Sequence, residues 1–265
     1  MSNKLTLNMI GGGFQHAFSS CGWNHPKHVV WDKTTHTSPI SIHIDAGVFE
    51  IVPDKSKLNI AWFCESPYFM WPYTKKFDIP DVKEWALKTY KFIFTSDKEL
   101  LKKHPELTYV IPHAHPWIQD RKIFSKTKLT SIIASAKKEA PGHILRHSVI
   151  DTYGDFIDTF GGGYNPIKLK EEGLKDYMFS FSIENIQSDG YFTEKICDCF
   201  ATGTIPIYWG DKTISDHFLT EGIICLEDGF DSSFLTKEFY ESKKSFIEEN
   251  FHKAINLPIS EDYIY

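Results

Sequence analysis

The chain has 265 residues, of which 42% are hydrophobic and 15% aromatic, so it can bury one large core or two smaller ones and is too apolar for a disordered protein. Its 29 basic and 35 acidic residues give a net charge of −6, which argues against a general nucleic-acid binder or a binder of anionic membranes. The apolar run Leu5–Ile10 is too short for a signal peptide, and no stretch approaches the roughly 20 apolar residues of a membrane span.

Short apolar runs alternate with helical patterns, which predicts an α/β fold with parallel sheets. The expected strands are Leu5–Ile10, Ser41–Asp45, Leu58–Phe63, Phe92–Thr95, Tyr109–Pro112, Thr130–Ala134, Met178–Ile183, Thr204–Trp209 and Ile223–Leu226. The expected helices are Val82–Tyr90, Lys98–Lys103, Ile144–Tyr153, Leu169–Asp176, Glu194–Thr202 and Ser232–Asn250. Nine strands divide well into two Rossmann-like halves, and the polar stretch between His113 and Leu129 separates them. We therefore expect domains at residues 1–120 and 121–265, with a tail that can pack back on the first.

Three glycines, Gly11–Gly13, follow the first expected strand. A dinucleotide-binding GxGxxG pattern that starts at Gly11 would need a glycine at position 16, where this chain has a histidine. We therefore expect the glycines to allow a close backbone approach to a neighbouring loop or to an acceptor, rather than to bind a cofactor.

Glu65 follows the apolar run Leu58–Cys64, so its carboxylate lies at the carboxyl end of an expected strand. Such a carboxylate can serve as a general base toward a ligand, although a solvated strand end is the alternative that the residues alone favour. The aromatic residues Phe69, Trp71 and Tyr73 follow closely and could either stack on a ligand or belong to the core between the domains.

The stretch Tyr177–Gly210 is the most informative part of the chain. It predicts a buried strand at Met178–Ile183, a polar loop, a helix that Thr193 can cap, and a second buried strand. The helix start offers free backbone N–H groups, a positive dipole end and Lys195, which together suit a phosphate. An ordinary capped helix with a solvated Glu194 and Lys195 explains the same pattern.

In these residues the chain resembles the donor-binding signature of the α-1,3-fucosyltransferases, family 10 of the glycosyltransferases. The similarity rests on FSIEN, YFTEK and IPIYWG at the family's spacing. Upstream, Trp62–Pro67 resembles the family's acidic segment, Ser131–Arg146 resembles its strand-loop-arginine segment, and Gly161–Gly163 falls where the family often has glycines. The resemblance extends from about residue 58 to residue 218.

This resemblance implies the glycosyltransferase B fold, in which two Rossmann-like domains face a cleft. It also implies an inverting transfer of fucose from GDP-fucose to a glycan hydroxyl, with the acceptor on the first domain and the donor on the second. Another nucleotide sugar or acceptor is an open alternative. A non-catalytic nucleotide-sugar- or glycan-binding module is another, and it would not need Glu65. A phosphate-ester hydrolase would need a nucleophile or a two-metal cluster, and the sequence suggests neither.

The family's motifs also imply roles for single residues. The residue matching Glu65 would be the catalytic base. Those matching Arg146 and Lys195 would neutralise the diphosphate, and the one matching Glu194 would accept hydrogen bonds from the ribose hydroxyls. The whole expected donor-binding set is Arg146, Glu184, Asn185, Tyr191, Thr193, Glu194 and Lys195.

We expect no required cofactor, because Arg146 and Lys195 can balance the diphosphate charge and the chain has no DxD motif, although a divalent metal can stimulate release of the leaving group. His113 and His115 could share a metal, but loop or packing roles are favoured since no third ligand is evident. The five cysteines show no zinc spacing, which indicates reduced thiols in the cytoplasm. Animal family members have an N-terminal membrane anchor, whereas this chain resembles the catalytic region alone, as in bacterial members.

Overall fold

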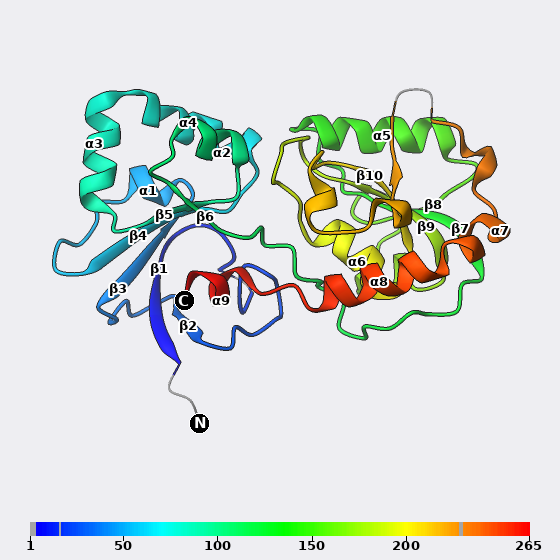
Figure 1. Cartoon of the computed structure of the whole chain (residues 1–265), viewed down its shortest axis with the longest axis horizontal. Helices are drawn as coiled ribbons and strands as arrows, with labels where there is room; N and C mark the ends of the chain where they lie inside the picture. The colour runs from blue at the N-terminus through cyan, green and yellow to red at the C-terminus, as the bar shows by residue number, and fades with distance from the viewer. Residues whose placement is uncertain (1–3, 16, 228–229) are drawn as a thin grey trace. The chain divides into compact units, whose positions relative to one another are not determined.

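The computed structural model describes residues 4–15, 17–227 and 230–265 and forms two compact α/β units (Figure 1). The first unit takes in the chain up to His113 together with Ser188–Tyr191 and Pro258–Tyr265, and the second comprises Ala114–Gln187 and Phe192–Leu257. The division after His113 lies at the start of the polar stretch that the sequence marks as a boundary, ahead of the predicted 120/121. Two short later segments return to the first unit, which a single boundary cannot describe.

The first unit is built on a six-stranded parallel sheet in the order β2-β1-β3-β4-β5-β6. Its strands are β1 (Leu5–Gly11), β2 (Val29–Asp32), β3 (Ile40–Ile44), β4 (Leu58–Phe63), β5 (Ile93–Thr95) and β6 (Thr108–Tyr109). Its helices are α1 (Gly47–Glu50), α2 (Pro67–Thr74), α3 (Pro80–Thr89), α4 (Lys98–Lys103), α9 (Ser260–Ile264) and the 3₁₀ helix η1 (Lys75–Asp78). Because parallel strands end at the same edge of a sheet, the segments that follow β1, β3 and β4 share one edge.

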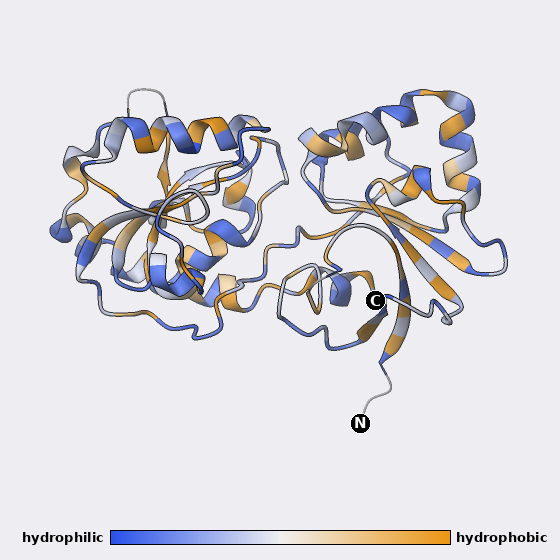
Figure 2. Cartoon of the chain, turned by 180° about the vertical axis from the view of Figure 1, so that it is seen from behind, coloured by the Kyte–Doolittle hydropathy of each residue, from blue (hydrophilic) through white to orange (hydrophobic). Residues whose placement is uncertain are grey.

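The second unit has a five-stranded parallel sheet in the order β11-β10-β9-β7-β8. Its strands are β7 (Lys128–Ile133), β8 (Asp158–Phe160), β9 (Tyr177–Ile183), β10 (Ile205–Trp209) and β11 (Ile224–Cys225). Its helices are α5 (Pro141–Tyr153), α6 (Glu194–Thr202), α7 (Lys237–Ser242) and α8 (Lys244–Ile255), with 3₁₀ helices η2 (Lys170–Gly173), η3 (Ile214–Asp216), η4 (Thr220–Gly222) and η5 (Ser232–Phe234). Every residue of β9 is buried, as a strand covered on both faces requires. The sheet strands are mainly orange in Figure 2, whereas the outer helices mix blue and orange.

The predicted elements agree with the structure best where the hydrophobic pattern is strong. The bounds of β4, α4 and α6 are those expected from the sequence. Prediction missed β2, β8, α1, α2 and α9, and the expected helix Ser232–Asn250 is in fact η5, α7 and most of α8. The expected helix Leu169–Asp176 contains only the short 3₁₀ helix η2. Pro72 lies inside α2, and a proline in a helix interior is the reason that no helix was predicted there.

Two contacts connect segments of the first unit that lie far apart in the sequence. Gly11 has a φ of +102°, and a Cβ atom on it would lie 2.9 Å from the carbonyl oxygen of Ile44, so the expected close backbone approach is present at Gly11, whereas Gly12 has open space around it. The fully buried carboxylate of Glu261 in α9 accepts hydrogen bonds from Ser20 N at 2.7 Å and Trp31 Nε1 at 3.1 Å. The C-terminal helix is therefore an integral part of this unit.

Candidate functional site

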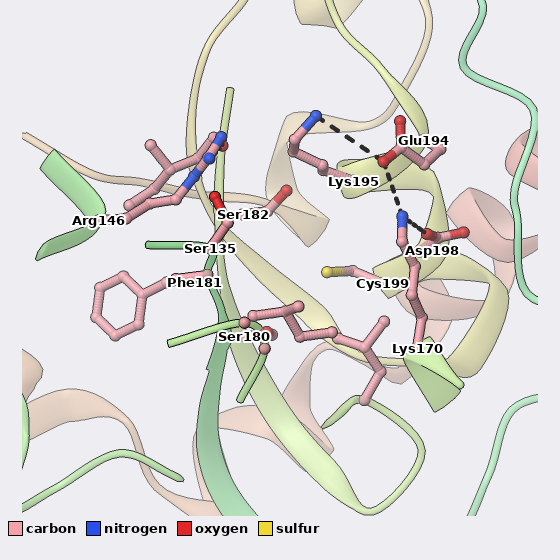
Figure 3. Close-up of a pocket in the computed structure, with 16 residues that line it drawn as sticks. Ser135, Arg146, Lys170, Ser180, Phe181, Ser182, Glu194, Lys195, Asp198 and Cys199 are labelled. Atoms are coloured by element: carbon pink, nitrogen blue, oxygen red, sulfur yellow. Dashed lines mark hydrogen bonds and ion pairs between the residues drawn. The ribbon is translucent and has the colours of Figure 1, made fainter. Parts of the chain in front are cut away.

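The second unit has a cavity of about 290 Å³ at the carboxyl edge of its sheet (Figure 3). The ends of β7 and β9, the glycines after β8, the start of α6, η2 and Arg146 of α5 contribute to its wall. In the sheet, β8 lies on one side of β7, and β9, the next strand along the chain, lies on the other side. The strand order therefore reverses between β7 and β9. Ligands of open α/β sheets bind at such a reversal, and this cavity is therefore the candidate site.

Arg146 is a buried residue of α5 whose guanidinium group is fixed by the segment that ends β9. Its Nε donates to the carbonyl oxygen of Ile183 at 3.0 Å, and its Nη2 donates to Asn185 Oδ1 at 3.2 Å. The start of α5 packs tightly on the same segment, since a Cβ atom on Gly142 would lie 1.7 Å from the Glu184 carbonyl oxygen. The arginine is thus held in one orientation at the wall of the cavity.

Glu184 supports the start of α6 from inside the protein. Its fully buried carboxylate accepts hydrogen bonds from Thr193 N and Thr193 Oγ1, each at 2.8 Å, and lies 3.2 Å from Lys195 Nζ. Thr193 occupies the predicted N-cap position, but its hydroxyl group donates to Glu184 and does not accept a backbone N–H of α6. Neither Glu184 nor Thr193 is among the residues that line the cavity.

The first turn of α6 places Glu194 and Lys195 at the cavity. Two further charged residues, Lys170 of η2 and Asp198 of α6, also line it and were missed by the sequence reasoning. Lys170 Nζ lies 2.7 Å from Glu194 Oε1 and 2.8 Å from Asp198 Oδ2. Burial opposes the charge of Lys170, yet the carboxylates of Asp198 and Glu194 outweigh this effect and raise its pKa. Asp198 follows Glu194 by four residues, a spacing that shares a helix face and could have revealed it.

The remaining donor-set residues, Asn185 and Tyr191, occupy different surroundings. Asn185 is half-buried and accepts the hydrogen bond from Arg146. Tyr191 belongs to the first unit, and the centroid of its buried ring lies 6.5 Å from that of the His113 ring. The structure therefore brings Arg146, Glu194 and Lys195 to one cavity, with Asn185 behind the arginine.

Glu65 lies at the carboxyl end of β4 in the first unit, as expected, and its side chain is exposed. The backbone before it is fixed by Asp45, whose Oδ1 accepts hydrogen bonds from Cys64 N at 2.8 Å and from Glu65 N at 3.0 Å. Asp45 itself has a φ of +53°, which is unusual for a residue with a side chain. Burial raises the pKa of Asp45. The Glu65 carboxylate also accepts a hydrogen bond from Ser66 N at 2.6 Å, and its role as a general base stays a prediction.

The aromatic residues after Glu65 form part of α2. Phe69 and Tyr73 pack against the first unit's own core, and the hydroxyl group of Tyr73 donates to Glu50 at 2.6 Å. Trp71 is 61% exposed, with the Lys75 ammonium group 4.0 Å from its ring centroid. Among the three, Trp71 thus has the most accessible ring.

His115 is a packing residue, as favoured from the sequence, because its Nδ1 is paired with Leu257 O at 2.7 Å and its Nε2 with Arg121 at 2.9 Å. In the described ranges, no group of three or more His, Cys, Asp or Glu side chains has the arrangement of a metal site. The helices that the structure describes are all too short or too polar to cross a membrane.

Comparison with known proteins identifies the domain that contains the cavity. Residues 123–245 match the sequence model of a family described as glycosyltransferase family 10 (fucosyltransferase), C-terminal part. This part of the chain is therefore similar to the family 10 glycosyltransferase domain. All seven residues of the expected donor-binding set lie within this domain, whereas Glu65 lies outside it.

Curated relatives extend the similarity beyond the family 10 domain. The chain is 28% identical over 202 residues to the alpha-(1,3)-fucosyltransferase FucT of Helicobacter pylori. This alignment covers 72% of this chain and 38% of the relative. It is 26% identical over 186 residues to the putative fucosyltransferase R654 of Acanthamoeba polyphaga mimivirus, which covers 64% of this chain and 28% of the relative. The chain thus spans less than two fifths of the length of either relative.

A solved structure supports the fold. The crystal structure of an alpha1,3-fucosyltransferase with GDP aligns with a TM-score of 0.52 and 16% identity, over 97% of this chain and 83% of that one. Together with the two parallel sheets, this similarity confirms the predicted glycosyltransferase B class of fold. The roles of the individual site residues stay predictions.

Proposed function

We propose that the chain transfers fucose from GDP-fucose to a hydroxyl group of a glycan acceptor, with inversion at the anomeric carbon. The observation that carries the proposal is the joint presence of Arg146, Glu194 and Lys195 at one cavity of the family 10 domain. Guanidinium and ammonium groups beside a helix N-terminus suit a diphosphate, and a carboxylate next to them suits a ribose.

Breaking the bond between the sugar and the diphosphate leaves extra negative charge on the leaving group. Arg146 is held by Ile183 and Asn185, and Lys195 by a hydrogen bond to Thr193 Oγ1 at 2.7 Å. Cations that are already in place stabilise such charge without the cost of reorganisation. They are the groups that we propose to assist departure of GDP.

The acceptor hydroxyl must lose a proton as it attacks the anomeric carbon. We propose Glu65 as the base, because its carboxylate is exposed while its backbone is fixed by Asp45. Attack by the deprotonated hydroxyl and departure of GDP in one displacement would invert the anomeric centre. Trp71 offers an exposed ring on which a sugar of the acceptor could stack.

We further propose that GDP binding needs no divalent metal, because Arg146 and Lys195 supply two positive charges at the cavity. Calorimetric titration of GDP in excess chelator should give an affinity close to that measured with magnesium. Loss of binding in chelator would show that the anion site has been assigned wrongly. Stimulation of turnover alone by a metal would be compatible with the proposal.

A panel of nucleotides and nucleotide sugars tests the donor. At about 100 times its dissociation constant, a ligand of the folded state adds roughly 2.7 kcal/mol of stability, which a thermal shift detects. GDP and GDP-fucose should stabilise the protein far more than UDP or ADP compounds. Stabilisation by UDP-sugars without guanine nucleotides would overturn the donor assignment, and donor binding without transfer to any glycan would favour a non-catalytic binding module.

The cytoplasm is the compartment that we propose for the enzyme. All five cysteines lie in the described residues and are free thiols, four of them buried. Free buried thiols are typical of a reducing compartment. Fractionation of source cells would test this assignment.

A further inference from the structure

Lys170 is a charged residue of the cavity to which the proposed chemistry gives no role. It begins η2, far in sequence from the helix that carries Glu194 and Lys195. Figure 3 shows its ammonium group between the carboxylates of Glu194 and Asp198, with dashed lines to both. The Lys170 side chain has 29% of its surface exposed, so it is neither a solvated surface lysine nor a fully buried one.

Asp198 anchors this lysine. One oxygen of the buried Asp198 carboxylate accepts hydrogen bonds from Trp117 N at 2.7 Å and Ile118 N at 3.2 Å, and the other pairs with Lys170. The ammonium group also lies 4.6 Å from the centroid of the Trp117 ring. Asp198 and Trp117 therefore hold the Lys170 ammonium group in place at the wall of the cavity.

The two lysines that line the cavity differ in the carboxylate that lies nearest to each. Lys170 lies 2.7 Å from Glu194, whereas Lys195 lies 3.2 Å from Glu184 and 3.9 Å from Glu194. Lys170 thus pairs closely with Glu194 Oε1, the oxygen that also lies 3.9 Å from Lys195 Nζ, and restrains the orientation of the Glu194 carboxylate. Without Lys170, the nearest cation to Glu194 would be Lys195, and a closer pair between them would draw both groups from their proposed ligands.

We propose that Lys170 is a positioning residue that orients Glu194 toward the ribose of the nucleotide and so gives the site its preference for a ribonucleotide. The inference rests on the proposed function, because it takes GDP as the ligand and Glu194 as the partner of the ribose hydroxyls. It adds a residue that controls recognition of the ribose without itself touching it.

The test compares GDP with 2′,3′-dideoxy-GDP, which lacks both ribose hydroxyls, by calorimetry on the full chain. The wild type should bind GDP at least about tenfold more tightly, the value of a hydrogen bond to a charged group. In Lys170→Met and in Glu194→Gln this ratio should fall toward one. The double variant should show no further loss, because both residues act through one interaction. Lys170→Arg should retain part of the preference.

Lys168→Met is the matched control, since Lys168 is an exposed lysine two residues away, and its ratio should equal that of the wild type. Removal of Lys170 leaves the Asp198 carboxylate without its cation, so Lys170→Met/Asp198→Asn provides a second variant if the single one fails to fold. Equal weakening of both nucleotides in the Lys170 variants, or an unchanged ratio, would overturn the positioning role while leaving the proposed function intact. Failure of the wild type to bind GDP would overturn both.

Discussion

At the scale of single residues, the position of the candidate base Glu65 depends on how its backbone is held. Asp45 binds the N–H groups of Cys64 and Glu65 from a left-handed backbone conformation. Residues held in such sparsely populated conformations cluster at functional sites, because the surrounding structure must stabilise them. Asp45 is therefore the residue that we expect to control how precisely Glu65 is aimed.

Replacing Glu65 by Gln should nearly abolish transfer, by about 10²–10⁴ in rate, and leave GDP affinity within a few-fold. Lys195→Ala should weaken GDP binding and slow transfer, because a phosphate contact acts in both the ground and the transition state. Initial rates together with calorimetry separate the two effects. Glu50→Gln is the matched control, since Glu50 is an exposed carboxylate paired with Tyr73. If Glu65→Gln transferred fucose at near wild-type rate, the base would lie elsewhere, and Asp45 and Glu50 would be the next candidates.

Asp45→Asn should lower the turnover number by about tenfold while GDP affinity is retained, because the amide keeps one acceptor oxygen but holds the two N–H groups less strongly than a carboxylate. Asp54→Asn is its control, since Asp54 is an exposed aspartate in the same unit that also accepts a backbone N–H. Steady-state kinetics on both variants would check this. Equal rates for the two would show that Asp45 has no positioning role.

Sequence reasoning found Arg146, Glu194 and Lys195, which match motifs, and missed two other charged residues of the cavity, Lys170 and Asp198. Glu194 and Lys195 follow a helix-start pattern, and both line the cavity. Lys170 lies in η2, a separate element, so no spacing along the chain relates it to Glu194. The inward direction of the Glu184 side chain was also beyond the sequence, because a carboxylate at a strand end is usually solvated.

At the scale of elements, the start of α6 depends on one buried carboxylate. Glu184→Gln should place an amide NH₂ group against the hydroxyl of Thr193 or the ammonium of Lys195. We expect the free energy of unfolding to fall by about 1–3 kcal/mol, the cost of leaving a buried polar partner unsatisfied, and GDP affinity to fall as Lys195 loses its support.

Urea unfolding measures the first effect of Glu184→Gln and calorimetry the second. Glu248→Gln on the exposed face of α8 serves as a control for the loss of one negative charge. A Glu184→Gln protein as stable as Glu248→Gln would contradict the structural role of Glu184.

Elements with their own periodicity could be predicted, and elements stabilised mainly by partners could not. The strands β2 and β8 have only four and three residues and are strands because they pair with β1 and β7. The break in the expected helix Ser232–Asn250 has a local cause, since the hydroxyl of Thr236 accepts the N–H of Phe239 and begins α7.

At the scale of the whole molecule, the number of strands suffices to predict two Rossmann-like units, but of the two segments that return to the first unit only the C-terminal tail was expected. Ser188–Tyr191 and Pro258–Tyr265 join the first unit although neither segment is large enough to have a core. They are held by individual contacts, such as the hydrogen bond from Lys98 N to Asp189 O at 3.2 Å and the Glu261 carboxylate on Ser20. Such contacts leave no periodic signal in the sequence.

One buried amine should make the stability of the protein depend on pH. Lys126 Nζ donates to Lys175 O at 3.0 Å, Thr202 O at 2.8 Å and Thr204 Oγ1 at 2.9 Å, so it ties together the segments that flank β9 and α6. Burial lowers the pKa of Lys126 from 10.5 to about 7. Between these two values the unfolded chain holds a proton that the folded chain has lost.

The free energy of unfolding should therefore rise as the pH increases from about 7 toward 10, because stability rises with pH wherever the unfolded state binds more protons. Below pH 7 both states are protonated and the cost of burying the charge is present in full. Lys126→Met removes this group, so the difference in stability between wild type and variant should shift in favour of the wild type as the pH rises. Urea unfolding of both proteins at pH 6, 7, 8 and 9 measures that difference and cancels the titration of other groups. A difference that stays constant over this range would show that the Lys126 pKa is not lowered in the folded protein.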